Sequence, residues 1–361
     1  MPPAPYETSW TQHLTIDTIA LVLHRTLFHP FIASLIPLSL RAQATPYSHP
    51  AFILASAYAC LVAACHVLAA VNRRVAYGRP RCVDWEDEVV VITGGAGGLG
   101  RTLAQVWGMR GASVAVLDVR EMDGEGMEMG MGVRWYACDV GDAGQVEEAK
   151  GRVEKDLGTP TILINNAGIV NGKPMLALSP TEIERNFRIN LLSHFHTIRA
   201  FLPAMIRRKN GGTIVTVASI LGRLGAANLA DYTAAKAGLI AMHASLRAEL
   251  EHLATSAPIE YIGAANVKTV LVAPGQLSTP LFAGVRTPSR FLGPVVESVE
   301  LAREIVELVD EGMSGEISMP LYARWVQWLG VLPVGLQRVI RGLSGLDGAM
   351  RGFKPGEGKQ S

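Results

Sequence analysis

Short runs of β-branched residues, separated by longer stretches of helical periodicity, dominate the chain from about Val89 onward. The expected strands are Val89–Thr93, Ser113–Leu117, Val133–Ala137, Thr161–Ile164, Thr213–Val217, Val267–Ala273 and Glu316–Met319. Strands that alternate with helices build βαβ units and a parallel sheet. The runs are apolar throughout, as expected for strands buried on both faces. The pattern predicts an α/β fold with a doubly wound parallel sheet of about seven strands, flanked by helices.

The residues before this alternation are unusually apolar. Ala51–Val71 is uncharged and, as a helix, long enough to cross a hydrocarbon core of about 30 Å. A buried core helix is the alternative, whereas a secretory signal is disfavoured because the first 24 residues contain no Lys or Arg. Residues 14–40 are also apolar but carry Pro30 and Pro37, so they fit a second span or half of a hairpin within one leaflet.

Basic residues follow the apolar run directly, and they are Arg73, Arg74, Arg79 and Arg81. The positive-inside rule places that side of the membrane in the cytosol. We therefore expect a hydrophobic membrane-anchor region of N-terminal helices over 1–85, a main domain over 86–320 and an apolar, amphipathic tail over 321–361. In the tail, Trp325 and Trp328 lie near arginines, which indicates a helix at the membrane surface or a subunit or domain interface.

Overall charge and residue spacing exclude several functions. The 33 Lys and Arg residues nearly balance 32 Asp and Glu, so no global field favours nucleic acid. The four cysteines form no CxxC pair, which fits a reducing compartment, and the nine histidines show no metal-ligand spacing. We expect no metal site.

A glycine-rich loop, TGGAGGLG, follows the first expected strand and opens a helix. Glycine lets the backbone approach a phosphate closely, and the helix N-terminus offers free amides to a pyrophosphate. The residues expected to bind a dinucleotide here are Thr93, Gly94, Gly98, Leu99 and Gly100. The loop makes the expected fold Rossmann-type.

Asp118, at the end of the second expected strand, can accept hydrogen bonds from the adenosine ribose. Its carboxylate repels a 2′-phosphate, so NAD(H) is favoured and NADP(H) is the alternative. Arg120, two residues later, could reverse this preference by binding that phosphate.

Tyr232 and Lys236 stand four residues apart in DYTAAKAG, hence on one helical face. A nearby ammonium favours the phenolate, so the tyrosine can exchange a proton with an alcohol or carbonyl oxygen. Ser219 follows another expected strand and can hold that oxygen. INNAG places Asn165, Ala167 and Gly168 where they can line the cofactor.

These motifs, in this order and spacing, resemble the classical short-chain dehydrogenase/reductase family over roughly Glu88–Pro320. The matching residues beyond those above are Asp139 and Val140 on the adenine side, Asn190, and Pro274, Gly275 and Thr279 of the PGxxxT motif. The resemblance implies Tyr232 as acid/base and Ser219 as stabiliser of the reacting oxygen. It implies that Tyr232 and Lys236 also bind the cofactor, with Lys236 on the nicotinamide ribose, where it lowers the tyrosine pKa. It implies that Asn190 anchors a water in the proton relay, and that cofactor contacts extend through the PGxxxT motif. It also allows a homodimer through the helices that carry Asn190 and Tyr232.

The anchor narrows the resemblance to the branch of 17β-hydroxysteroid dehydrogenase type 11 and retinol dehydrogenase 10-like enzymes, on the membrane of the endoplasmic reticulum or the lipid droplet. In the family the segment after PGxxxT covers the substrate, and here Leu277 and Phe282 are the expected substrate contacts, with Ser219 and Tyr232. The apolar segment suits a retinoid, a steroid or a long-chain lipid. The alternatives are an NADPH-dependent ketoreductase and a non-catalytic scaffold that retains the fold.

Overall fold

The computed structural model describes residues 14–122, 132–256, 261–282, 284–285, 287 and 289–353. Contacts divide the chain into two units, Met1–Arg79 with Arg290–Leu292, and Pro80–Ser289 with Gly293–Ser361. The larger unit contains every expected site residue.

A seven-stranded parallel sheet forms the centre of the larger unit, in the order β3-β2-β1-β4-β5-β6-β7. Its strands are β1 Val89–Thr93, β2 Ser113–Asp118, β3 Val133–Ala137, β4 Ile162–Asn165, β5 Gly212–Val217, β6 Val267–Val272 and β7 Gly315–Ile317. The chain reverses direction across the sheet between β1 and β4, which is the switch point where ligands of such sheets bind. This confirms the predicted Rossmann-type fold.

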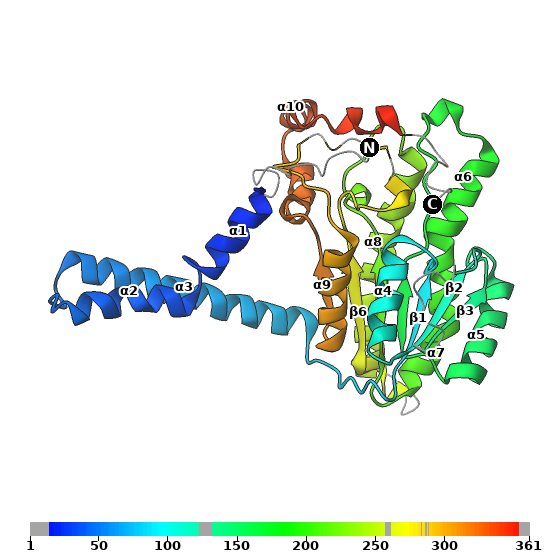
Figure 1. The fold of residues 1–361 in the computed structure, drawn as a ribbon, viewed down its shortest axis with the longest axis horizontal. Helices are drawn as coiled ribbons and strands as arrows, with labels where there is room; N and C mark the ends of the chain where they lie inside the picture. Colours follow the sequence, from blue (N-terminus) through cyan, green and yellow to red (C-terminus); the bar gives the residue numbers. More distant parts are fainter. Residues whose placement is uncertain are drawn as a thin grey trace, which may run out of the picture. The chain divides into compact units, whose positions relative to one another are not determined.

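Helices cover both faces of this sheet (Figure 1). The α-helices of the unit are α4 Gly98–Met109, α5 Ala143–Leu157, α6 Pro180–Phe187, α7 Ser193–Arg207, α8 Ala230–Ser256, α9 Ser298–Asp310 and α10 Val334–Ser344. Alternate residues of β1 enter opposite cores, Ile92 with α4 and α9, and Val91 with α5 and α7. Burial on both faces explains why the strand sequences show no polar alternation.

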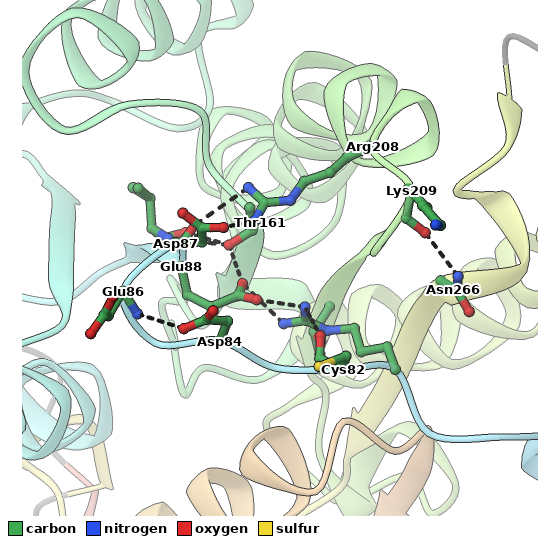
Figure 2. Close-up of polar contacts among 12 residues, drawn as sticks. Cys82, Asp84, Glu86, Asp87, Glu88, Thr161, Arg208, Lys209 and Asn266 are labelled. Atoms are coloured by element: carbon green, nitrogen blue, oxygen red, sulfur yellow. Dashed lines mark hydrogen bonds and ion pairs between the residues drawn. The ribbon is translucent and has the colours of Figure 1, made fainter.

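A buried ion pair closes the amino-terminal edge of the sheet. The guanidinium of Arg81 donates to both carboxylate oxygens of Glu88, at 2.7 and 3.0 Å, and to the hydroxyl of Thr213 at 2.9 Å. Figure 2 shows Glu88 facing Thr161, whose hydroxyl donates to the same carboxylate. Arg81 was expected to flank a membrane helix, but it is buried in the larger unit and cannot face lipid headgroups.

Three helices make up the described part of the smaller unit, and they are α1 Ile16–Arg25, α2 Pro30–Ala42 and α3 Pro50–Tyr77. Helices α2 and α3 pack against each other along their lengths (Figure 1). Within the described residues, α3 alone is long and apolar enough to cross a membrane, and almost none of it is buried. Helices α1 and α2 reach that threshold together but bend by 53° at their junction.

Candidate active site

The glycine loop between β1 and α4 is packed too closely to admit side chains. Gly94 has a φ of +65°, and a Cβ there would lie 2.8 Å from the Cα of Ala167. A Cβ on Gly100 would lie 2.5 Å from the carbonyl oxygen of Gly94. The first turn of α4 therefore presents bare backbone amides, which is the cradle that a pyrophosphate requires. These residues fit a dinucleotide.

Asp118, at the carboxyl end of β2, is held by backbone amides. One carboxylate oxygen accepts from the amide of Ala96 and the other from that of Arg120, both at 3.0 Å. The Arg120 side chain is 64% exposed, yet its terminal nitrogen would lie 3.1 Å from a Cβ on Gly97. A carboxylate and a guanidinium thus flank the glycine loop at the position where an adenosine ribose would sit.

Thr93 joins the glycine loop to the loop after β4. Its hydroxyl oxygen accepts from the amides of Asn166 and Ala167 at 3.0 and 3.1 Å. The side chain of Asn166 donates to the carbonyls of Thr93 and Gly94. Sequence reasoning selected Asn165 instead, but the side chain of Asn165 is buried and its oxygen accepts from Thr197 of α7 at 2.7 Å. A cofactor contact from Asn165 would have to come from its backbone.

Two further residues expected on the adenine side, Asp139 and Val140, follow β3. The carboxylate of Asp139 accepts from the amide of Gly141 at 2.9 Å, which shapes the turn before α5. Val140 is buried in the core beneath that turn, as Leu99 is beneath the glycine loop. Leu99 and Val140 can therefore offer a cofactor their backbone only.

Ser219, Tyr232 and Lys236 meet beyond the carboxyl ends of β5 and β6, all of them buried. The hydroxyl of Ser219 forms a hydrogen bond with the phenol of Tyr232. The ammonium of Lys236 donates to the carbonyl of Val217 at 2.8 Å and lies 5.7 Å from the centroid of the Tyr232 ring. The helical spacing of tyrosine and lysine thus places both side chains on the sheet-facing side of α8.

Asn190 lies in a π-helical turn, η3 Arg188–Leu192, between α6 and α7. Its side-chain oxygen accepts from the amide of Ile169, and its nitrogen donates to the carbonyl of Ile169, both at 2.9 Å. A Cβ on Gly168 would lie 3.0 Å from this oxygen and 3.8 Å from the Lys236 nitrogen. Gly168 therefore lies close to both Asn190 and Lys236, where a larger side chain would meet them. Such π turns often occur at functional sites.

Burial governs the ionisation of this group. It raises the pKa of Tyr232 well above its ordinary value, although the Ser219 hydrogen bond opposes this. It lowers the pKa of Lys236 to about 8, because a buried ammonium loses its hydration. Behind them, burial lowers the pKa of His194 well below its ordinary value, and the nearby Lys236 charge lowers it further. In this arrangement Tyr232 carries its proton and His194 is neutral at pH 7.

The PGxxxT segment reaches from Ser219 to the glycine loop. The carbonyl of Pro274 accepts from the Ser219 hydroxyl at 3.4 Å, and the amide of Gly275 donates to Met319. The methyl of Thr279 lies 3.3 Å from the position of a Cβ on Gly98. Thr279 therefore covers the first turn of α4, where it can contact a bound dinucleotide.

An apolar cluster covers Tyr232. Phe282, in the short helix η7 Pro280–Phe282, meets the Tyr232 ring edge to face with centroids 6.2 Å apart. The other residues that pack with Tyr232 and Phe282 are Val170, Leu221, Ala226, Leu229, Val285, Met350 and Phe353. Leu277 was also expected to contact substrate, but it is buried in the sheet core, where it pairs with Val296, and is not part of this cluster.

Sequence reasoning did not identify Met350 and Phe353, which belong to η10 Leu346–Gly352 and the residue after it. They lie more than a hundred residues beyond Tyr232 in the chain, in a segment with no motif. The apolar character of the tail was the only available signal.

Comparisons with known proteins agree with this geometry. The family model described as short chain dehydrogenase matches residues 88–289. The chain is 33% identical to retinol dehydrogenase 10 of Homo sapiens, over 58% of this chain and 67% of that protein. It is 31% identical to 17-beta-hydroxysteroid dehydrogenase 13 of Homo sapiens, over 61% of this chain and 71% of that protein.

A solved structure shares the fold. Levodione reductase superimposes with a TM-score of 0.55 and 24% identity, covering 65% of this chain and 97% of the other. The family match covers more than half of the chain, and the relatives confirm the predicted branch. Members of the family use nicotinamide dinucleotides. The chain is an oxidoreductase that belongs to the short-chain dehydrogenase/reductase family, in the branch of retinol dehydrogenase 10 and the 17-beta-hydroxysteroid dehydrogenases.

Proposed function

We propose that this protein is a membrane-anchored oxidoreductase that transfers a hydride between NAD(H) and the alcohol or carbonyl group of a lipophilic substrate, such as a retinoid, a steroid or a long-chain lipid. The buried group of Ser219, Tyr232 and Lys236 beneath an apolar cover carries this proposal. Each part of the reaction has a residue whose position suits it.

Tyr232 is the acid/base. Because burial keeps its phenol protonated, it can donate that proton to a carbonyl oxygen during reduction and recover it from an alcohol during oxidation. Ser219, which is hydrogen-bonded to the same phenol, holds the reacting oxygen. Lys236 supplies the positive charge that stabilises the phenolate in the oxidative direction. Asn190 fixes the backbone turn beside Lys236. The proton relay passes along this turn.

The glycine cradle would hold the dinucleotide, with Asp118 and Thr279 beside the cradle and Asp139 in the turn after β3. When bound, the dinucleotide donates or accepts the hydride. The Asp118 carboxylate at the ribose position favours NAD(H). A second candidate, an NADPH-dependent ketoreductase, is favoured by the guanidinium of Arg120 beside Gly97, which could pair with a 2′-phosphate.

The apolar cover supports a lipophilic substrate. Phe282, Val285, Met350 and Phe353 present carbon atoms over Tyr232, so a polar substrate would lose its hydration there without new partners. The names of two relatives point to a retinol and to a hydroxysteroid. The apolar cover supports a substrate of the same lipophilic class for this chain.

The anchor proposal depends on α3, whose exposed large apolar side chains occur from Ile53 to Val75. Arg73, Arg74 and Arg79 follow its apolar part, so the positive-inside rule orients the catalytic unit toward the cytosol, on the endoplasmic reticulum or the lipid droplet.

The test is cofactor-linked turnover of the full chain in bilayers, over a panel of lipophilic alcohols and ketones with each cofactor. Turnover with NAD(H) on lipophilic members of the panel supports the proposal, and turnover with NADPH alone supports the second candidate. The Tyr232→Phe protein is the control for background reduction. Turnover limited to small polar substrates would contradict the substrate class.

A further inference from the structure

A strip of apolar side chains points outward from the C-terminal part of the catalytic unit. The segment Leu321–Ser344 forms three elements, η8 Leu321–Arg324, η9 Val326–Val331 and α10. Its exposed large apolar residues are Trp325, Trp328, Val331, Val334, Leu336, Val339 and Leu343, and we call these seven residues the C-terminal strip. Trp325 is 64% exposed and Leu343 is 85% exposed. So many exposed large apolar side chains within one short segment are typical of an interaction site.

The strip belongs to an ordered part of the catalytic unit. Ala323, within η8, is fully buried, and the hydroxyl of Tyr322 lies against Gly275 of the PGxxxT segment. The outward exposure of the tryptophans is thus a property of a fixed surface, next to the segment that borders the active site.

The chemistry of the strip fits a lipid surface. Over Leu321–Ser344 the chain carries three arginines, Arg324, Arg338 and Arg341, and no acidic residue. Trp325 and Trp328 lie at η9, and Arg338 and Arg341 lie on α10, which is amphipathic. Exposed tryptophan and arginine with an amphipathic helix are typical of segments that bind in the headgroup region of anionic membranes. The chain also carries α3, an apolar helix fit to enter lipid. These features favour a lipid surface over a second copy of the chain.

The strip is connected to the cover over Tyr232. After α10 the chain turns at Gly345, which has a φ of +65°, and enters η10, where Met350 is buried in the Tyr232 cluster. An ion pair between Arg341 and Asp347, at 2.7 Å, ties α10 to η10. Phe353, which also packs in the cluster, lies against Gly172. Movement of α10 would therefore be transmitted to the residues above the phenol.

Tyr232 is only 3% exposed, so a substrate must displace part of this cover to reach it. We propose that the C-terminal strip binds an anionic lipid surface, and that this contact draws Met350 and Phe353 away from Tyr232 and opens the active site toward the lipid. The inference builds on the proposed function, since a lipophilic substrate would enter from that side. Its tests do not depend on turnover.

The first test measures lipid contact. The full chain is reconstituted in nanodiscs whose lipids carry bromine at a defined acyl depth, and tryptophan fluorescence is compared with that in unbrominated discs. We expect the bromine to quench the tryptophan fluorescence more strongly in anionic than in neutral lipid. A Trp325→Phe/Trp328→Phe protein should lose most of this quenching. Equal quenching in both proteins would overturn the proposal.

The second test measures opening. Hydrogen exchange of residues 346–353 is followed in anionic nanodiscs for the wild type, for Val339→Glu/Leu343→Glu in the strip, and for Val299→Glu, a matched exposed position on α9. We expect exchange in the strip variant to be slower than in the wild type, by about threefold or more, and exchange in Val299→Glu to equal the wild type.

Identical exchange in all three proteins would overturn the coupling between lipid contact and opening. A further outcome is crosslinking between the C-terminal strips of two chains that depends on protein concentration and not on lipid. That outcome would assign the surface to a second copy and would overturn the choice of partner. Because neither readout uses a substrate, loss of the proposed reaction and loss of this inference remain distinguishable.

Discussion

The buried pair of Arg81 and Glu88 makes a sharp prediction about stability. Replacing Arg81 with Met leaves the Glu88 carboxylate buried with only the Thr161 hydroxyl as a side-chain partner. Removing one partner of a buried ion pair costs about 3–5 kcal/mol, because the remaining charge loses its compensation. For a domain of this size, that cost lowers the melting midpoint by about 6–20 °C.

The assay is thermal unfolding of the full chain, followed by intrinsic fluorescence at one scan rate. A matched control is the exposed pair of Arg110 and Asp310, whose side chains are 48% and 31% exposed at a separation of 2.6 Å. Asp310→Asn should change the free energy of unfolding by less than about 1 kcal/mol, because solvent screens exposed pairs.

A double variant, Arg81→Met/Glu88→Leu, separates the pair from the packing around it. We expect it to be more stable than Arg81→Met alone, since no uncompensated charge remains. The reasoning is refuted if Arg81→Met unfolds within about 1 °C of the Asp310→Asn control, or if the double variant is less stable than Arg81→Met.

Three further predictions concern cofactor, ionisation and anchoring. Asp118→Asn should raise the ratio of NADP to NAD affinity by about tenfold, measured by cofactor titration, and a wild type that already prefers NADP would contradict the role of the carboxylate. Burial lowers the pKa of Lys236 to about 8, so above that pH the unfolded state binds more protons than the folded state. The free energy of unfolding should therefore rise between about pH 8 and 10.5, by at most about 3 kcal/mol. Denaturant titrations of Lys236→Met should lack that rise, and an equal rise in both proteins would show that other groups cause it. Deleting residues 1–79 should move the protein from the membrane pellet to the supernatant with cofactor binding intact, whereas deleting 1–85 also removes Arg81 and should give an unfolded product. Continued sedimentation of a folded 1–79 deletion would shift the anchoring role to the C-terminal strip.

Periodicity and motif spacing predicted the sheet well, because both depend on local sequence. The seven expected strands occur in the structure within about two residues of their predicted ends. The four-residue spacing of Tyr232 and Lys236 placed both on one helical face, since that spacing fixes direction once α8 forms. The position of the glycine loop was predictable for the same reason, because the motif lies directly between a strand and a helix in the sequence.

Residues whose role depends on distant partners could not be predicted in this way. Arg81 was grouped with the membrane-flanking arginines, because nothing in the sequence shows that Glu88 and Thr213 meet it in the interior. Leu277 was placed at the substrate, yet its pairing with Val296 directs it into the core. Met350 covers Tyr232 only because the tail returns across the site.

The π turn at Asn190 was not predicted either. Its sequence, RINLL, reads as ordinary helix, and within the wider turn the Asn190 side chain is hydrogen-bonded to the backbone of Ile169. Short-range propensity carries no information about such a distant contact.

The most direct test of the central claim is single-turnover hydride transfer by the full chain in bilayers, compared between wild type and Tyr232→Phe at matched cofactor occupancy. Loss of the phenolic proton should slow the transfer by about 10²–10⁴-fold, and the matched occupancy separates this effect from any change in cofactor binding. Hydride transfer by Tyr232→Phe at the wild-type rate would contradict the assignment of Tyr232 as the acid/base of this enzyme.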